Sequence, residues 1–351
     1  MISRKSFASI ENKIHPETSI ADKNFNRKKI LINHTDREIS KTLIEFINKN
    51  KYQISTGTGE WQWLENNKRS NYLECIRESN EEKLSQILAN MFKNEATYGY
   101  ISPSFDDIKN IDNENAVISD ILSNIDTCLE FTDLKKVRNL GIEKAIGNPF
   151  GLKINNLLTI LPDTPRHYYY SFKISNLLKN ENSTILEIGG GFGGLAHEIA
   201  KKKRNITYIG IDLLPGLFTT YYFLKKNNHR VTLVNENNQI KDGYLNLIPF
   251  EIFTNKFSKI ENIDLVFNSR SLCEMSLETI QMYFNFINRI KPDYIYHENS
   301  NFLLFPNSQR HLEILGSNFP VDLNNYKLEN LSITPFTGGA GRYREFLYRK
   351  K

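Results

Sequence analysis

A cluster of glycines near the middle of the chain carries the clearest chemical signal of the sequence. The short apolar run Thr184–Ile188 contains one acidic residue, Glu187, and leads directly into the glycine-rich stretch Gly189–Gly194. An amphipathic stretch typical of a helix comes next. Glycines let the backbone approach a ligand closely, and the N-terminus of a helix offers free N–H groups to it. The pattern predicts a nucleotide-type cofactor at the end of a strand in a doubly wound sheet.

Two templates match these glycines, and they imply different cofactors. Read as G-x-G-x-x-G, Gly189–Gly194 fits the dinucleotide fingerprint. Read with Glu187 as E-x-G-x-G-x-G, the same stretch fits class I S-adenosylmethionine (SAM) methyltransferases. Asp212 ends the next apolar run and suits either cofactor, because a carboxylate there accepts the ribose hydroxyl protons. SAM is favoured over NAD by Glu187, by a hairpin signal near the C-terminus, and by the lack of a Tyr-x-x-x-Lys or comparable hydride-transfer pair.

We expect the cofactor to contact residues at several strand ends. Asp212 should bind the ribose hydroxyls, Leu213 should pack on the adenine, and Asn235 or Glu236 should contact the adenine amine. Asn268 is expected at the sulfonium end. The full set of expected cofactor residues is Glu187, Gly189, Gly190, Gly191, Gly193, Asp212, Leu213, Asn235, Glu236, Asn268 and Ser269.

The elements that must position these residues follow from an alternation of apolar runs and amphipathic stretches. Two strand-like runs around Gly338–Gly341 predict a closing hairpin. The expected fold class is α/β: a Rossmann-like class I methyltransferase sheet, doubly wound, which ends in an antiparallel hairpin and follows a helical N-terminal domain. The expected strands are Thr184–Ile188, Thr207–Ile211, Val231–Val234, Asp264–Phe267, Tyr294–Tyr296, Leu331–Phe336 and Tyr343–Tyr348.

The part of the chain before this alternation has helical periodicity. Leu43, Ile44 and Ile47 form one apolar face, and Trp61 and Trp63 follow a glycine-rich connection as core or lid aromatics. A chain of 351 residues is longer than one core usually needs. We therefore expect a helical cap or oligomerisation domain over 1–145 and a SAM-dependent methyltransferase domain over 146–351. The helical part is a reasonable homodimer surface.

Composition and charge exclude several classes of protein. A net charge of +5 is modest for this length and does not indicate nucleic-acid binding. No segment approaches the roughly 18 apolar residues of a membrane span, and no apolar core of a signal peptide follows Met1–Lys5. We expect a cytoplasmic protein without an integral membrane segment. Cys75, Cys128 and Cys273 form no CxxC pair and are expected as buried thiols.

The glycine loop and several further motifs carry a family resemblance. The motifs are Gly147–Phe150, Leu186–Ala196, Ile211–Leu213 with Tyr221–Leu224, and Asn268-Ser269 with Glu274-Met275. In these motifs the chain, from about Leu140 to the C-terminus, resembles the sugar O-methyltransferases of bacterial surface-polysaccharide clusters. It departs from them where Leu214 precedes Pro215, because related proteins usually have Leu-Pro directly after the second-strand acid. The resemblance implies a glycan or a nucleotide-linked sugar as acceptor.

Transfer of a methyl group to a hydroxyl calls for a general base, or for a metal that acidifies the hydroxyl. We expect His297 as the base, with Glu298 orienting it or binding a metal, and Glu274 as the second candidate base. A partly buried structural role for His297 and a helix N-terminal role for Glu274 stay open. Glu298, Asp264 and Glu274 could supply a Mg²⁺ site, but their spacing does not require one, and we predict no metal ligands.

The sequence motifs predict a SAM-dependent methyltransferase. The family resemblance implies that it is an O-methyltransferase that acts on a sugar hydroxyl in bacterial capsule or lipopolysaccharide biosynthesis. Its partner would be a nucleotide-linked sugar or a glycan. Two alternatives remain at this point. The first is a SAM-binding, non-catalytic interaction module with a methyltransferase-like fold, and the second is an NAD-dependent oxidoreductase.

Overall fold

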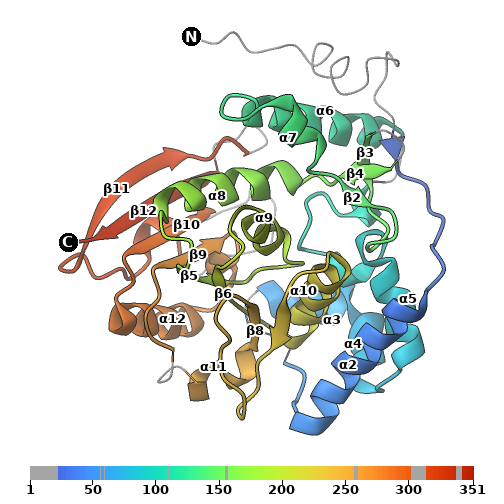
Figure 1. The fold of residues 1–351 in the computed structure, drawn as a ribbon, viewed down its shortest axis with the longest axis horizontal. Coiled ribbons are helices and arrows are strands. Elements are labelled where there is room, and N and C mark those ends of the chain that lie inside the picture. Colours follow the sequence, from blue (N-terminus) through green and yellow to red (C-terminus); the bar gives the residue numbers. More distant parts are fainter. Residues whose placement is uncertain are drawn as a thin grey trace. The chain divides into compact units, whose positions relative to one another are not determined.

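The computed structural model describes residues 23–55, 57–58, 60–108, 111–154, 157–256, 260–301, 314–336 and 342–351. These residues form two compact units, drawn in Figure 1. The first joins the described residues up to Glu45 with Asn71–Ile174, and the second joins Phe46–Ser70 with Ser175–Lys351. The early segment 46–70 therefore belongs to the same unit as the C-terminal half. The domain boundary expected near residue 145 stays a prediction.

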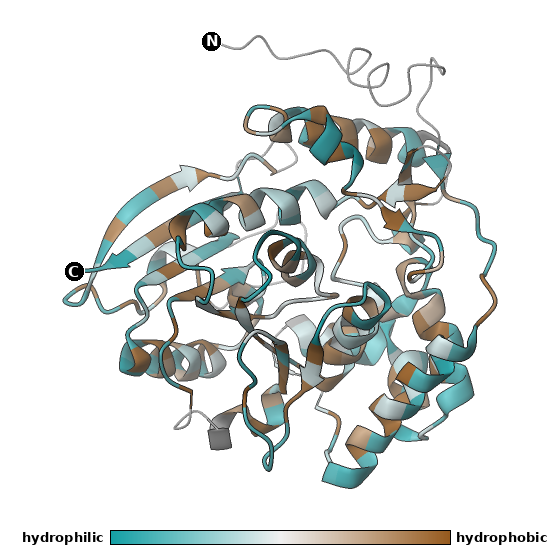
Figure 2. Cartoon of the chain, viewed as in Figure 1, coloured by the Kyte–Doolittle hydropathy of each residue, from teal (hydrophilic) through white to brown (hydrophobic). Residues whose placement is uncertain are grey.

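The first unit combines helices with a small antiparallel sheet of order β1-β3-β4-β2. Its helix α2 (His34–Asn50) buries Leu43 and Ile44, as the sequence periodicity predicts, and Figure 2 shows hydrophobic and hydrophilic residues along it. The sheet was not expected, because strands of two to four residues leave no readable period. The other elements are β1 (Lys23–Asn24), α4 (Ser70–Arg77), α5 (Glu81–Ala89), η1 (Met91–Lys93), η2 (Glu95–Thr97), η3 (Phe105–Asp107), α6 (Ile111–Cys128), α7 (Leu134–Arg138), β2 (Ile142–Glu143), β3 (Gly151–Ile154), β4 (Leu158–Ile160) and α8 (Thr164–Leu177).

The second unit is built on an eight-stranded sheet of order β11-β12-β10-β9-β5-β6-β8-β7. The six strands from β10 to β7 run parallel, and β12 is antiparallel to both β10 and β11. The predicted α/β fold class, a mostly parallel sheet that ends in an antiparallel hairpin, is confirmed. The elements are α3 (Glu60–Lys68), β5 (Thr184–Ile188), α9 (Gly194–Lys202), β6 (Thr207–Asp212), α10 (Leu214–Lys226), β7 (Val231–Leu233), β8 (Leu245–Pro249), α11 (Phe250–Lys256), β9 (Leu265–Ser269), η5 (Leu272–Glu274), α12 (Leu277–Ile290), β10 (Tyr294–Ser300), η6 (Gly316–Asn318), β11 (Tyr326–Ile333) and β12 (Tyr343–Lys350).

The outer strands of this sheet differ from the prediction at both edges. β11 runs over Tyr326–Ile333 and not over the expected Leu331–Phe336. The expected third strand, Val231–Val234, corresponds to β7, which lies at the sheet edge and not beside β6. The strand beside β6 is β8, whose Leu245 pairs with Tyr208. β8 was not predicted, because this five-residue run is short and follows a polar loop. The glycines expected at the hairpin turn, 338–341, lie outside the described residues.

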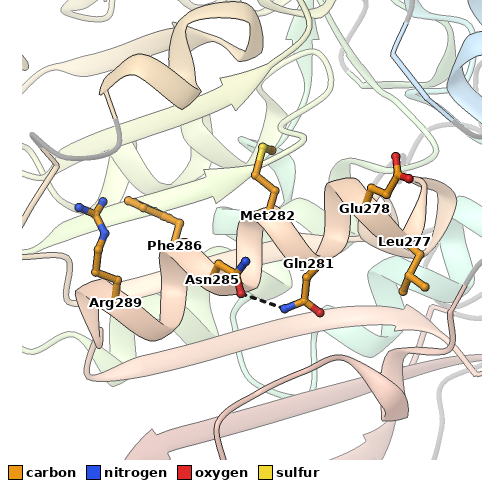
Figure 3. A pocket seen from close by; sticks show the side chains of 7 residues that line it. All are labelled: Leu277, Glu278, Gln281, Met282, Asn285, Phe286 and Arg289. Carbon is orange, nitrogen blue, oxygen red and sulfur yellow. Dashed lines mark hydrogen bonds between the residues drawn. The ribbon is translucent and has the colours of Figure 1, made fainter.

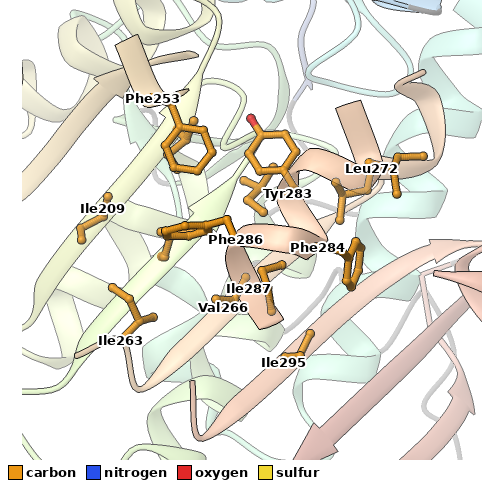
Figure 4. Packing of buried hydrophobic residues seen from close by; sticks show 14 of the residues in the cluster. Ile209, Phe253, Ile263, Val266, Leu272, Tyr283, Phe284, Phe286, Ile287 and Ile295 are labelled. Atoms are coloured by element: carbon orange, nitrogen blue, oxygen red, sulfur yellow. The ribbon is translucent and has the colours of Figure 1, made fainter. Parts of the chain in front are cut away.

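Apolar side chains bury both faces of the central strands, which is typical of a parallel sheet covered by helices on each side. Residues 185–188 of β5 are all buried. Leu186 and Ile188 join a core cluster with α11 and α12, whereas Ile185 points to the other face. Figure 4 shows Phe253 of α11 and Phe286 of α12 packed in this cluster. This core fixes the ends of β5, β6, β8 and β9 relative to one another.

Candidate active site

The glycine loop between β5 and α9 has a backbone that requires glycine. Gly189, Gly191 and Gly193 have φ values of 70°, 58° and 89°, in the left-handed region. A Cβ on Gly189 would lie 2.2 Å from Ser271 Oγ. The loop therefore presents a bare backbone at the carboxyl end of β5, and the buried Glu187 side chain lies directly behind Gly190.

Asp212 ends β6 and turns its carboxylate toward this loop. Its Oδ2 accepts a hydrogen bond from Gly191 N at 3.1 Å, and its Oδ1 accepts one from Leu213 N at 2.8 Å. Desolvation by the surrounding protein raises the pKa of Asp212 to about 7, and the two backbone donors oppose that shift. The structure thus brings together the predicted loop and the predicted acid, as neighbouring parallel strands must.

Asn268 connects three strand ends beneath the loop. Its Nδ2 donates to Ile188 O at 2.7 Å and to Ser271 Oγ at 2.6 Å, and its Oδ1 accepts from Asn299 Nδ2 at 2.8 Å. The side chain is 1% exposed. Asn268 therefore braces the ends of β5, β9 and β10, and its polar groups are already engaged within the protein.

Glu298 of β10 is the buried partner in an ion pair with Arg270, whose side chain is 21% exposed. Its carboxylate accepts from Ser269 Oγ at 2.7 Å and from Arg270 Nη2 at 3.0 Å. Arg270 has a left-handed backbone, with φ of 65°, and its guanidinium lies 4.3 Å from the ring centroid of Tyr343. Because Glu298 is fully buried and held by cationic and hydroxyl donors, it is suited to positioning Arg270.

His297 lies in a different environment from Glu298, its neighbour in sequence. Both residues are inside β10 and not after it, which corrects the expected end of this strand. Successive strand residues point to opposite faces, so the two side chains do not meet. The His297 ring stacks 4.6 Å from Phe346 and also contacts Phe319, and burial lowers its pKa to about 3.

Glu274, the second candidate base, follows β9 as Arg270 does, four residues further along the chain. It ends the short helix η5 after β9 and is only partly buried. The pKa of Tyr343 is raised by burial and further by the Glu274 charge, while Arg270 and Arg342 lower it. The charges of Glu274 and Arg270 therefore both act on the Tyr343 hydroxyl.

Glu251 is a further candidate for the functional site, which was not predicted because β8 was not predicted. It lies in the first turn of α11, directly after β8. Burial raises its pKa to about 7, and the charge of Asp212 raises it further. Backbone amides of Ser55 and Leu214 oppose the shift, yet neither carboxylate oxygen has a hydrogen bond of normal geometry from any described residue. The alternating apolar residues of Leu245–Pro249 were the available signal.

Asn235 and Glu236, the expected adenine contacts, follow the edge strand β7. Asn235 closes a local turn, accepting from Asn238 N at 2.9 Å. Glu236 shares a pocket of about 770 Å³ with Glu251, Tyr52 and Ser55. Glu251 thus occupies the strand-end position beside Asp212 that was expected for residues 235–236.

A second pocket lies on the outer surface of α12, as Figure 3 shows. All seven of its lining side chains come from this one helix, and Gln281 donates to Asn285 at 2.9 Å within it. It contains none of the strand-end residues. This surface is separate from the candidate active site.

Neither a metal cluster nor a membrane span is found in the parts of the chain that the structure describes. No three His, Cys, Asp or Glu side chains there are grouped to hold a metal ion. None of the described helices is long and apolar enough to cross a membrane. Cys75, Cys128 and Cys273 are buried free thiols, as expected.

Comparison with known proteins gives no family membership, since no family model and no curated protein matches the chain. Among solved structures, the N-terminal domain of EvdMO1, determined with SAH and D-fucose, is similar over 63% of this chain and 98% of that one, with 11% identity and a TM-score of 0.38. Mitomycin 7-O-methyltransferase MmcR is similar over 54% of this chain, with 13% identity and a TM-score of 0.37. The similar region spans 56% of the MmcR chain.

Proposed function

We propose that this chain is a SAM-dependent methyltransferase. The observation that carries the proposal is the hydrogen bond from Gly191 N to Asp212 Oδ2, which joins a bare glycine loop to an acid at the next strand end. Such a pair suits the ribose of a nucleotide-type cofactor. The acidic Glu187 behind the loop and the closing hairpin favour SAM over NAD.

The residues present fit an adenosine group in two further ways. Gly189, Gly191 and Gly193 adopt left-handed backbone conformations, so the loop carries no side chains at these three positions. The buried Glu251 carboxylate lacks a partner of normal geometry among the described residues. We assign Glu251 to the adenine amine and Leu213 to the adenine face. Asp212 takes the ribose hydroxyls.

We assign the acceptor side to the ends of β9 and β10. When bound, SAM supplies an electrophilic methyl group on a sulfonium sulfur. The acceptor oxygen would be aligned with this methyl group and would lose its proton as the new C–O bond forms. The methyl–sulfur bond would break in the same step, and its electron pair would stay on the departing sulfur. Glu274 is our candidate for receiving that proton, because it is partly exposed and lies near Tyr343 and Arg270. Glu298 positions Arg270, and His297 is the weaker candidate because it is buried among aromatic rings.

We further propose that the acceptor is a sugar hydroxyl, on a nucleotide-linked sugar or a glycan, in cytoplasmic steps of capsule or lipopolysaccharide synthesis. This finer proposal rests on the family resemblance of the sequence motifs. Incubation with methyl-labelled SAM and a panel of nucleotide sugars tests it. Label in a sugar product supports the proposal, whereas SAM binding without transfer to any acceptor favours a non-catalytic SAM-binding module.

A further inference from the structure

A segment from the N-terminal half of the chain lies along the carboxyl ends of the strands in the large sheet. We call its described residues, 52–55 and 57–58, the strap, and they belong to the same compact unit as the sheet. At one end of the strap, Tyr52 and Ser55 line the cavity of about 770 Å³ that also contains Glu251, in the first turn after β8. The strap therefore reaches the strand end that we assign to adenine.

The strap also contacts residues that follow two other strands. A Cβ on Gly57 would lie 2.9 Å from a Leu213 methyl group, just after the end of β6. Thr58 Oγ1 accepts from Ser276 N at 3.3 Å, at the start of α12, the helix that follows β9. In the sheet order, β5 and β6 lie between β9 and β8. Because the strap contacts residues after β8, β6 and β9, it passes the end of β5 as well, where the glycine loop begins.

The cavity at the first end contains two buried polar groups that lack partners. Neither the Tyr52 hydroxyl nor either carboxylate oxygen of Glu251 has a hydrogen bond of normal geometry with any described residue. Buried polar groups are nearly always hydrogen-bonded, and an unpaired one costs free energy. Tyr52 and Glu251 line one cavity, whose volume is in the range of small-molecule sites. A ligand that bonds to both groups would remove this cost.

Packing holds the Tyr52 ring and leaves its hydroxyl as the group to be bonded. The ring centroid lies 5.5 Å from that of Phe46, and the side chain packs against the core cluster of the large sheet. The backbone N of Tyr52 donates to Ile47 O at 3.4 Å. Burial raises the pKa of Tyr52 to about 12, so the hydroxyl keeps its proton at neutral pH and can donate a hydrogen bond.

We propose that the strap forms one wall of the cofactor pocket and that Tyr52 and Glu251 together recognise the edge of the adenine. This inference rests on the proposed function, to which it adds a residue that determines specificity for the base. Adenine presents a donor, its exocyclic amine, beside an acceptor, its ring nitrogen N1. The Glu251 carboxylate accepts from the amine, and the Tyr52 hydroxyl donates to N1. The two unpartnered groups thus match two adjacent polar groups of one base.

Removal of one atom from the protein and one from the ligand tests this contact. The ligands are S-adenosylhomocysteine and its 1-deaza analogue, in which a C–H group replaces N1. By titration calorimetry, the wild type should bind the adenosine compound about threefold to tenfold more tightly than the analogue. Tyr52→Phe keeps the ring and removes the hydroxyl, so it should bind the two compounds equally. A merely structural role of Tyr52 would weaken both by the same factor and leave their ratio unchanged.

A matched tyrosine and a second measurement complete the test. Tyr244→Phe, at a partly buried tyrosine outside the strap and the cavity, should keep both wild-type affinities. In the wild type, bound S-adenosylhomocysteine should slow amide hydrogen exchange in residues 52–55 and leave β11, at the far edge of the sheet, unchanged. This measurement decides alone if Tyr52→Phe does not fold.

Three results would overturn the inference: a wild type that binds both compounds equally, a folded Tyr52→Phe variant with the wild-type ratio, or unchanged exchange in residues 52–55. A wild-type chain that binds neither compound would instead refute the proposed function.

Discussion

The carboxylates around the candidate site differ in the groups that surround them, and we base their proposed roles on this difference. Glu298 is fully buried against Arg270 and Ser269, whereas Glu274 remains partly exposed. Asp212 and Glu251 both have a pKa raised to about 7 by burial. Buried carboxyl groups with a strongly raised pKa are typical of functional sites. We therefore propose that Asp212 and Glu251 accept hydrogen bonds from the cofactor.

Replacing the proposed base should remove turnover without removing cofactor binding. Glu274→Gln keeps the shape of the side chain but cannot accept a full proton. We expect a loss of methyl transfer of about 10²-fold or more, with SAM affinity near that of the wild type. The matched control is Glu278→Gln, which changes an exposed carboxylate on α12. Equal activity of both variants in the labelled-methyl assay would remove Glu274 from the mechanism.

His297 should matter for the acid stability of the protein and not for its chemistry. Its pKa is about 3 in the folded chain, against 6.5 for an ordinary histidine. The unfolded chain binds the extra proton first, so folding stability is lost as the pH falls from about 6.5 toward 3. His297→Phe should retain methyl transfer and lose less of its melting temperature on acidification than the wild type. Loss of transfer in a folded variant would restore His297 as the base.

At the scale of elements, strand bounds could be predicted best where an apolar run ends at several glycines. β5 has the predicted bounds, and its loop and Asp212 come together because adjacent parallel strands end at one edge. Short or atypical elements could not be predicted. β8 was not predicted, and Glu251, which follows it, was therefore not recognised as a candidate. The predicted strand ended at Tyr296, because the polar residues that follow it are typical of a loop. In the structure β10 continues through His297 and Glu298.

Alanine substitutions at Gly189, in the glycine loop, and at Gly243, outside it, should differ in their effect on stability and on SAM binding. Gly189→Ala adds a Cβ that would lie 2.2 Å from Ser271 Oγ on a backbone with φ of 70°. Gly243 has a similar φ of 67°, but its added Cβ meets nothing closer than 3.6 Å. Gly243→Ala should cost only the roughly 1–2 kcal/mol of left-handed backbone. Gly189→Ala should cost more and should also weaken SAM binding. Equal melting temperatures and affinities would contradict the account of the loop.

At the scale of the whole molecule, the proposed cofactor site draws on residues far apart in the chain. The unit with the large sheet includes Phe46–Ser70 as well as the C-terminal half. No local pattern in the sequence connects Gly57 with Leu213, which lie side by side because the chain folds back on itself. A homodimer through the helical N-terminal part stays a prediction, which sedimentation of the full chain can check.

The central claim is that this chain binds SAM through the glycine loop and Asp212. Titration calorimetry of the wild-type chain and of Asp212→Asn, with SAM and separately with NADH, tests it most directly. We predict saturable SAM binding by the wild type, a loss of about tenfold or more in Asp212→Asn because an anionic acceptor is removed, and no NADH binding. A wild-type chain that binds no SAM, or binds NADH instead, would contradict the account.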